Sequence, residues 1–213
     1  MVHQRAIEIS MRSIDAINKV VAPADKTKLQ SLIGKINFIR RFISNLSGKI
    51  RAFIPLLKLK ADQKCVWGKE QQLALDEIKN YLANPPVLFP PQHEKPFRLY
   101  LSIDDTVIGS ALIQEFEGKE YVIYYLSRRL VDAETRYSAI EKLCLCLYFS
   151  CTKLRHYLLL AICKDDVVRY MLSMPIMSGR IGKWILALSE FDLRYESAKA
   201  VKGQIMASFV TQH

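Results

Sequence analysis

The sequence predicts a mixed α/β protein in which a small helical module precedes a sheet-containing domain. Apolar residues recur at three- and four-residue intervals between Lys26 and Leu46, which is the period of a helix. From Phe97 onward the apolar residues alternate with a period of two, which indicates strands. Residues 84–91 separate the two patterns, and their four prolines break regular structure. We therefore place a domain boundary there.

The helical module contains three predicted helices. Asp25 is the expected N-cap of the first, over residues 26–46, and two more follow over 50–59 and 70–82. We interpret Gly34, inside the first helix, as permitting close packing rather than the approach of a ligand. The apolar stripe of the first helix consists of Leu29, Leu32, Ile33, Ile36, Ile39, Phe42, Ile43 and Leu46.

The second half predicts three consecutive antiparallel strands followed by a long helix and then by further strands and helices. Its long helix carries an apolar face of Ile140, Leu143, Leu147, Cys151, Leu154 and Leu158. The expected elements are a strand hairpin at 97–114, a strand at 121–126, the long helix at 133–157, a strand at 158–163, a helix through Tyr170, a helix at 179–188 and a strand at 191–195.

Positive charge is concentrated in the first part of the chain. The 213 residues have a formal net charge of +10, and residues 1–60 hold twelve Lys and Arg against three acids, which gives +9 there (12 − 3). Such asymmetry favours a basic module that faces a polyanion, although a solubilising surface gives the same count.

Composition excludes several classes of protein. No apolar run approaches the length of a membrane span, and the N-terminus lacks the apolar core of a signal peptide, so we expect a soluble, intracellular protein of the cytoplasm or nucleus. The five cysteines form no CxxC pair and are expected to pack as small apolar residues. The four histidines have no zinc-site spacing.

Several sequence blocks resemble the polyproteins of gypsy-type LTR retrotransposons. Residues 99–112 resemble the first strand pair of their RNase H domain, and residues 125–142 resemble the block that opens its long helix. Residues 29–43 are similar to the thumb helix of their reverse transcriptases. The match is collinear over essentially the whole chain, and Lys202-Gly-Gln204 is closest to divergent plant elements. The resemblance implies a helical thumb and connection, followed along the chain by an RNase H-like mixed sheet.

The same resemblance divides the chain into four segments. It implies the residual end of a polymerase palm, the thumb and connection, an RNase H-like domain, and a C-terminal tail. Because fingers and most of the palm are absent, no polymerase activity is expected. The corresponding ranges are 1–22, 23–90, 91–200 and 201–213.

An RNase H holds two Mg²⁺ ions among about four converging carboxylates. The first family position is Ser102 here, so a neutral hydroxyl replaces the central bridging carboxylate. The second matches Glu141, and the third matches Asp165 loosely, because only six residues separate Leu158 from it. The fourth is Ser208, again a serine in place of an aspartate. We expect Glu141 and Asp165 to be vestigial catalytic and metal-binding residues, the domain to be inactive, and no Mg²⁺ to be bound.

Asp104 and Asp105 offer two alternatives that we weigh and set aside. Asp104 shares the face of Ser102, but two residues along a strand span about 7 Å, which is too far for a bridging ligand. The segment Ser102-Ile-Asp-Asp105 copies a polymerase YxDD hairpin only superficially, since no palm precedes it. We interpret both aspartates as turn formers.

Binding is the function that remains. In the family the thumb helix tracks a duplex backbone, so Lys35, Arg40, Arg41, Lys49 and Arg51 are candidates for sequence-independent contacts with phosphates of an RNA:DNA hybrid or duplex. A solvated basic face fits the same spacing. The sequence therefore predicts an inactive, nucleic-acid-binding fragment of a reverse transcriptase/RNase H polyprotein. An active RNase H and a non-enzymatic nucleic-acid-binding protein are the alternatives, and no membrane partner is expected.

Overall fold

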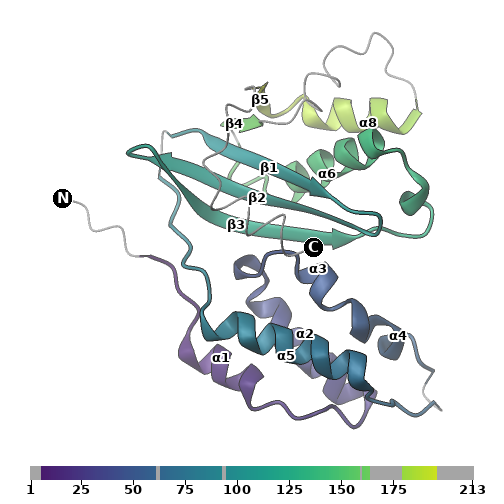
Figure 1. Cartoon of the computed structure of the whole chain (residues 1–213). Helices are drawn as coiled ribbons and strands as arrows, with labels where there is room; N and C mark the ends of the chain where they lie inside the picture. The colour runs from purple at the N-terminus through teal and green to yellow at the C-terminus, as the bar shows by residue number, and fades with distance from the viewer. Residues whose placement is uncertain (1–5, 61–62, 93–94, 159, 164–178, 196–213) are drawn as a thin grey trace.

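The computed structural model describes residues 6–60, 63–92, 95–158, 160–163 and 179–195. A central sheet separates two helical layers (Figure 1). The helices of the first half of the chain cover one face of the sheet, and two helices of the second half cover the other. The helices of the first half thus pack directly on the sheet that the second half forms.

The first-half layer begins with two capped helices. The side chain of Ser10 accepts from the Ser13 backbone N–H at the start of the first, and Asp25 accepts from the Lys28 N–H, 2.8 Å away, at the start of the second. Within the described ranges, no helix combines the length and apolar composition needed to cross a membrane. The bounds are α1 Met11–Asn18, α2 Lys26–Phe38, η1 Arg40–Phe42, α3 Leu46–Lys49, η2 Arg51–Phe53, α4 Ile54–Leu57 and α5 Lys69–Ala83.

The first predicted helix is too long, because α2 ends at Phe38 and a 3₁₀ turn and the short helix α3 follow. Asn45 has a left-handed backbone (φ 45°) and caps α3 by accepting from the Gly48 N–H. A residue in that conformation cannot continue a right-handed helix. The helix predicted over 70–82 is confirmed as α5, whereas the one at 50–59 is shorter and is split into η2 and α4.

The described strands form one sheet with the order β3-β2-β1-β4-β5. The three antiparallel strands are confirmed, and the hairpin between β2 and β3 turns at Glu117 and Gly118, both with positive φ as a two-residue hairpin turn requires. The short fourth strand joins the sheet parallel to β1, pairing Phe97 with Ala161 and Leu99 with Cys163. The bounds are β1 Phe97–Ile103, β2 Val107–Phe116, β3 Lys119–Arg129, β4 Leu160–Cys163 and β5 Asp192–Tyr195.

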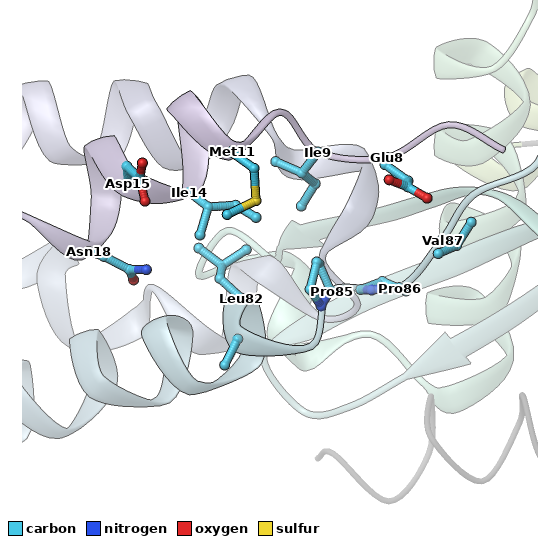
Figure 2. A pocket seen from close by; sticks show the side chains of 11 residues that line it. Glu8, Ile9, Met11, Ile14, Asp15, Asn18, Leu82, Pro85, Pro86 and Val87 are labelled. Carbon is cyan, nitrogen blue, oxygen red and sulfur yellow. The ribbon is translucent and has the colours of Figure 1, made fainter. Parts of the chain in front are cut away.

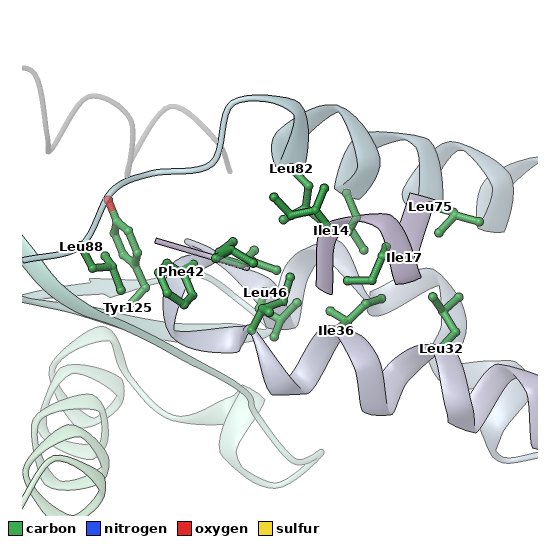
Figure 3. Packing of buried hydrophobic residues seen from close by; sticks show 14 of the residues in the cluster. Ile14, Ile17, Leu32, Ile36, Phe42, Leu46, Leu75, Leu82, Leu88 and Tyr125 are labelled. Atoms are coloured by element: carbon green, nitrogen blue, oxygen red, sulfur yellow. The ribbon is translucent and has the colours of Figure 1, made fainter. Parts of the chain in front are cut away.

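Two hydrophobic cores lie on opposite faces of the sheet. Because successive strand side chains point to opposite faces, Tyr100 packs with the first-half helices while its neighbour Leu101 packs with the second-half ones. Figure 3 shows Tyr125 of β3 and Leu88 beside Phe42 and other residues of the first core. Leu88, from the proline-rich segment, is fully buried and bridges to Ile7, so this segment is part of the packed structure.

The second layer is built on α6 (Ala139–Lys153), with the 3₁₀ turn η3 (Glu134–Arg136) before it and α8 (Gly179–Leu188) beside it. The predicted start at residue 133 is wrong because Tyr137 and Ser138 are extended, and Ser138 caps α6 instead. The predicted helix at 179–188 is confirmed. The predicted helix through Tyr170 lies outside the described residues.

The buried face of α6 also differs from its prediction. It includes Lys142, Cys146 and Ser150, which recur every four residues, whereas Ile140 and Leu143 are only partly buried. The expectation that cysteines pack inside the protein is confirmed for Cys144, Cys146 and Cys151, whose thiols are reduced and whose side chains are buried. Polar side chains as well as apolar ones therefore face the sheet from α6.

Candidate functional site

Ser102 lies near the carboxyl end of β1, where it pairs with Gly109 of β2. The thiol of Cys146 on α6 donates to the Gly109 carbonyl at 3.1 Å and contacts the Ser102 carbonyl at 3.8 Å. The position at which the resemblance expects a metal-binding aspartate is therefore covered by α6, with a thiol against its backbone.

A buried cation lies one helical turn before Cys146. The ammonium of Lys142 donates to the Asp105 carbonyl at 3.3 Å and lies 3.6 Å from an Asp105 carboxylate oxygen. The Lys142 side chain is only 9% exposed, whereas that of Asp105 is 99% exposed, so solvent screens the ion pair on one side. Lys142 thus holds α6 against the β1–β2 turn.

Asp104 and Asp105 form that turn, as the sequence indicates. The Asp104 carboxylate accepts from the Asp105 N–H, and the Asp104 N–H donates to the Val107 carbonyl. Both side chains are exposed. Their interpretation as turn formers is confirmed.

Glu141 occupies the first turn of α6 and forms a capping box with Ser138. Its carboxylate accepts from the Ser138 N–H at 3.0 Å and from the Ser138 hydroxyl at 3.1 Å, while the Ser138 hydroxyl accepts from the Glu141 N–H. The Ser138 backbone N–H is the main cause that lowers the pKa of Glu141. Glu141 therefore has a structural role at this helix end.

The donors described at this end of β1 do not fit Mg²⁺. A serine hydroxyl, a thiol and a nearby ammonium cannot neutralise a hard cation that prefers an octahedron of oxygen ligands. Within the described ranges, no three His, Cys, Asp or Glu side chains gather as a possible metal site. Asp165 and Ser208 lie outside the described residues.

Lys142 and Cys146 were missed as residues of this site by the reading of the sequence. The signal that would have found them is their four-residue spacing, which Ser150 continues along the same face of α6. From the sequence alone, a lysine on a helix is expected to face solvent unless its partner on another element is known.

The five predicted phosphate contacts do not share one surface. Lys35 donates to the Ala16 carbonyl of α1 at 3.4 Å, and Arg40 and Arg51 are exposed. Arg41 lies over the ring of Phe42 at 5.0 Å, and among the described atoms its buried Nε has no hydrogen-bond partner.

Lys49 is half-buried in a cleft of about 450 Å³ between α3, α5 and the β1–β2 turn. Its ammonium lies 5.3 Å from the ring centroid of Tyr81, and burial lowers its pKa while Glu77 opposes that change. Glu70, Glu77 and Asp104 also line this cleft, beside Lys49 and Arg51. We call this hollow the α3–α5 cleft, and its mixture of positive and negative side chains does not favour the binding of a polyanion.

A groove of about 350 Å³ between α1 and α2 has only positively charged lining residues, unlike the α3–α5 cleft. We call it the α1–α2 groove; Lys19, Lys28 and Lys35 line it, and no acidic residue does. Lys28 also lies 3.8 Å from Asp25 in an exposed pair. Lys19 and Lys28 were missed as candidates, although the charge count of residues 1–60 pointed to them.

The exposed face of α2 beside this groove is unusually open. A Cβ on Gly34 would meet no atom within 4 Å, so the interpretation of Gly34 as a packing glycine is wrong. One turn later the side chain of Phe38 is 79% exposed. The pair leaves a smooth, partly aromatic surface on which another molecule can approach the helix backbone.

A further hollow lies between α1, the end of α5 and the proline-rich segment. Figure 2 shows Met11, Ile14 and Leu82 in this pocket of about 320 Å³. Glu8 and Asp15 are its charged lining residues, and no Lys or Arg lines it. It is therefore unsuited to phosphate.

Comparison with known proteins agrees with the fold. Residues 67–164 match the RNase H-like domain found in reverse transcriptase. Over 189 residues the chain is 27% identical to the Transposon Tf2-3 polyprotein of Schizosaccharomyces pombe. The aligned region covers 84% of this chain and 14% of that polyprotein. The chain thus spans about a seventh of the length of the curated relatives it matches.

Solved structures of the foamy viral protease-reverse transcriptase share the architecture. The structure in complex with dsDNA superposes with a TM-score of 0.74 at 19% identity, covering 92% of this chain and 43% of that one. The structure in complex with RNA/DNA hybrid gives a TM-score of 0.75 at 19% identity, covering 92% and 28%. The chain therefore has the RNase H-like fold and is similar to part of a retrotransposon or retroviral polyprotein.

Proposed function

We propose that this chain is the thumb, connection and RNase H-like part of a gypsy-type retrotransposon polyprotein of the divergent plant type. Its proposed segments are the end of the palm at 1–22, the thumb and connection at 23–90, the RNase H-like domain at 91–200 and a tail at 201–213. We expect it to act inside the cell, where unpaired buried thiols such as Cys151 persist. Collinear similarity over 84% of the chain supports this assignment.

The proposed activity is sequence-independent binding of a nucleic-acid duplex. The observation that carries it is the α1–α2 groove, because Lys19, Lys28 and Lys35 line it without an acidic residue. The adjoining face at Gly34 and Phe38 lets a duplex come close to α2. The neighbouring foamy viral enzymes were solved with dsDNA and with an RNA/DNA hybrid, which supports the same class of ligand here.

We further propose that the RNase H-like domain does not cleave RNA. Ser102 supplies no charge, Glu141 caps α6, and the ammonium of Lys142 lies at the adjoining turn. A two-metal mechanism needs converging carboxylates that neutralise the ions. The function of the chain would then be nucleic-acid binding by residues of the thumb.

Fluorescence anisotropy with a labelled RNA:DNA hybrid tests the binding, with affinity measured as a function of salt. Changing both Lys28 and Lys35 to Gln should lower the affinity and reduce the salt slope by about 1.8, since each lost phosphate contact removes about 0.9. Lys183→Gln, an exposed lysine on α8, is the matched control and should leave both unchanged. Salt-independent binding, or equal binding by the double variant, would contradict the proposal.

A further inference from the structure

A crevice of about 160 Å³ lies at the outer edge of β3, where both halves of the chain meet. We call it the β3-edge crevice. The end of α2, the start of η1, α3, β3 and the C-terminal half of α6 all contribute to it. Asn37, Arg40, Ser47, Ser127 and Lys153 are among the residues that line it.

Two cations reach this crevice from different halves of the chain. Arg40 begins η1, and Lys153 is the last residue of α6. None of the lining residues is acidic, and across the described ranges neither Arg40 nor Lys153 forms an ion pair or a side-chain hydrogen bond. Their charges are therefore available to a ligand, unlike those in the α3–α5 cleft, where three carboxylates oppose two cations.

Two other lining residues, one from each half of the chain, are hydrogen-bonded to each other. The Ser47 N–H donates to the Ser127 hydroxyl at 2.9 Å, and that hydroxyl donates to the Ser47 hydroxyl at 3.2 Å. These bonds tie α3 to β3 across 80 residues of sequence. The distance between the two halves is thereby set before any ligand binds, which lowers the entropy lost on binding.

The size and position of the crevice suit one phosphate group of a longer chain. Its volume corresponds to about five water molecules. Lys35 lines the α1–α2 groove and Asn37 lines the crevice, so both hollows reach the last turn of α2. From Lys28 to Phe38, α2 rises about 15 Å, which is between four and five base-pair steps of a duplex.

We infer that the β3-edge crevice holds a backbone phosphate of the bound duplex between Arg40 and Lys153. The duplex then passes at this edge from the helical module onto the RNase H-like domain, and Lys153 is its contact on that domain. The inference rests on the proposed function, since it names a second contact for the same ligand. An extended peptide added along β3 is the alternative occupant, but the two unopposed cations favour a polyanion.

The test compares Lys153→Gln and Arg40→Gln with the Lys183→Gln control, using a DNA duplex and an RNA:DNA hybrid as probes. Each crevice variant should lower the affinity about fivefold at ~0.15 M salt and reduce the salt slope by about 0.9, as expected for one lost phosphate contact. Lys153 is decisive because it lies on α6, outside the thumb. Both side chains are exposed, so thermal unfolding of the variants should match that of the wild type.

The outcomes separate this inference from the proposed function. If the wild type binds in a salt-dependent manner and Lys153→Gln retains both affinity and slope, the crevice is not a phosphate site, although the thumb still binds. A loss of affinity at an unchanged slope would also overturn the inference, because it would indicate a contact other than phosphate. If the wild type binds neither probe, both proposals fail.

Discussion

The buried hydrogen bond between Ser150 and Ser110 offers a quantitative test of how α6 is seated on the sheet. The Ser150 hydroxyl donates to the Ser110 hydroxyl at 2.7 Å, and both residues are at most 1% exposed. Replacing either serine by alanine leaves the other hydroxyl buried and unpaired, which costs about 1–3 kcal/mol. Replacing both removes the unpaired group, so the double variant should lose no more stability than either single variant.

Urea unfolding of the four proteins in this double-mutant cycle measures the coupling. We expect a coupling free energy of about 1 kcal/mol or more at an unchanged m-value. Thr152→Ala is the matched control, because Thr152 lies on the same helix with an exposed hydroxyl, and it should change the free energy of unfolding by less than about 0.5 kcal/mol. Additive single effects, or single effects as small as that of the control, would refute this account of the α6 interface.

Three further predictions concern titratable and capping groups. Burial raises the pKa of Tyr125 to about 12 from 10.0, so the Tyr125 hydroxyl loses its proton in the unfolded chain before it does so in the folded one. As pH rises from 10 to 12, the free energy of unfolding should therefore fall by up to roughly 2–3 kcal/mol. Urea unfolding across this pH range measures the fall, and Tyr125→Phe should remove it. Ser138→Ala should cost about 1 kcal/mol in the same assay, and Glu141→Gln less, because glutamine can complete the capping box; equal costs would contradict the capping role. Burial raises the pKa of Cys144 to about 11 and of Cys151 to about 12, so peptide mapping after iodoacetamide treatment at about pH 8 should find both unlabelled until the protein is unfolded, and labelling of the native protein would argue against the packing.

Local periodicity was sufficient to predict most of the fold. The three antiparallel strands follow from a period of two, and α5 and α8 follow from a helical period with clear ends. The end of α2 could not be predicted in this way, because the apolar spacing continues past Phe38 through a 3₁₀ turn. The backbone leaves the α-helical conformation at Ile39 and is extended at Ile43, and the left-handed Asn45 then begins α3.

The candidate sites were harder to predict because they depend on which elements meet. Lys142 and Cys146 are buried because α6 packs over the β1–β2 turn, and their four-residue spacing on one face of the helix does not by itself show which element covers them. Arg40 and Lys153 are 113 residues apart in sequence and meet at the edge of β3. Lys49, by contrast, was predicted as a phosphate contact but lies half-buried beside acidic residues.

Binding without cleavage is tested by incubating the purified chain with a labelled RNA:DNA hybrid and Mg²⁺ and following complex formation and RNA length together. We expect a complex that dissociates as salt is raised while the RNA stays intact, because Ser102 and Glu141, which caps α6, provide no metal site. Mg²⁺-dependent shortening of the RNA that is lost in Glu141→Gln would contradict it.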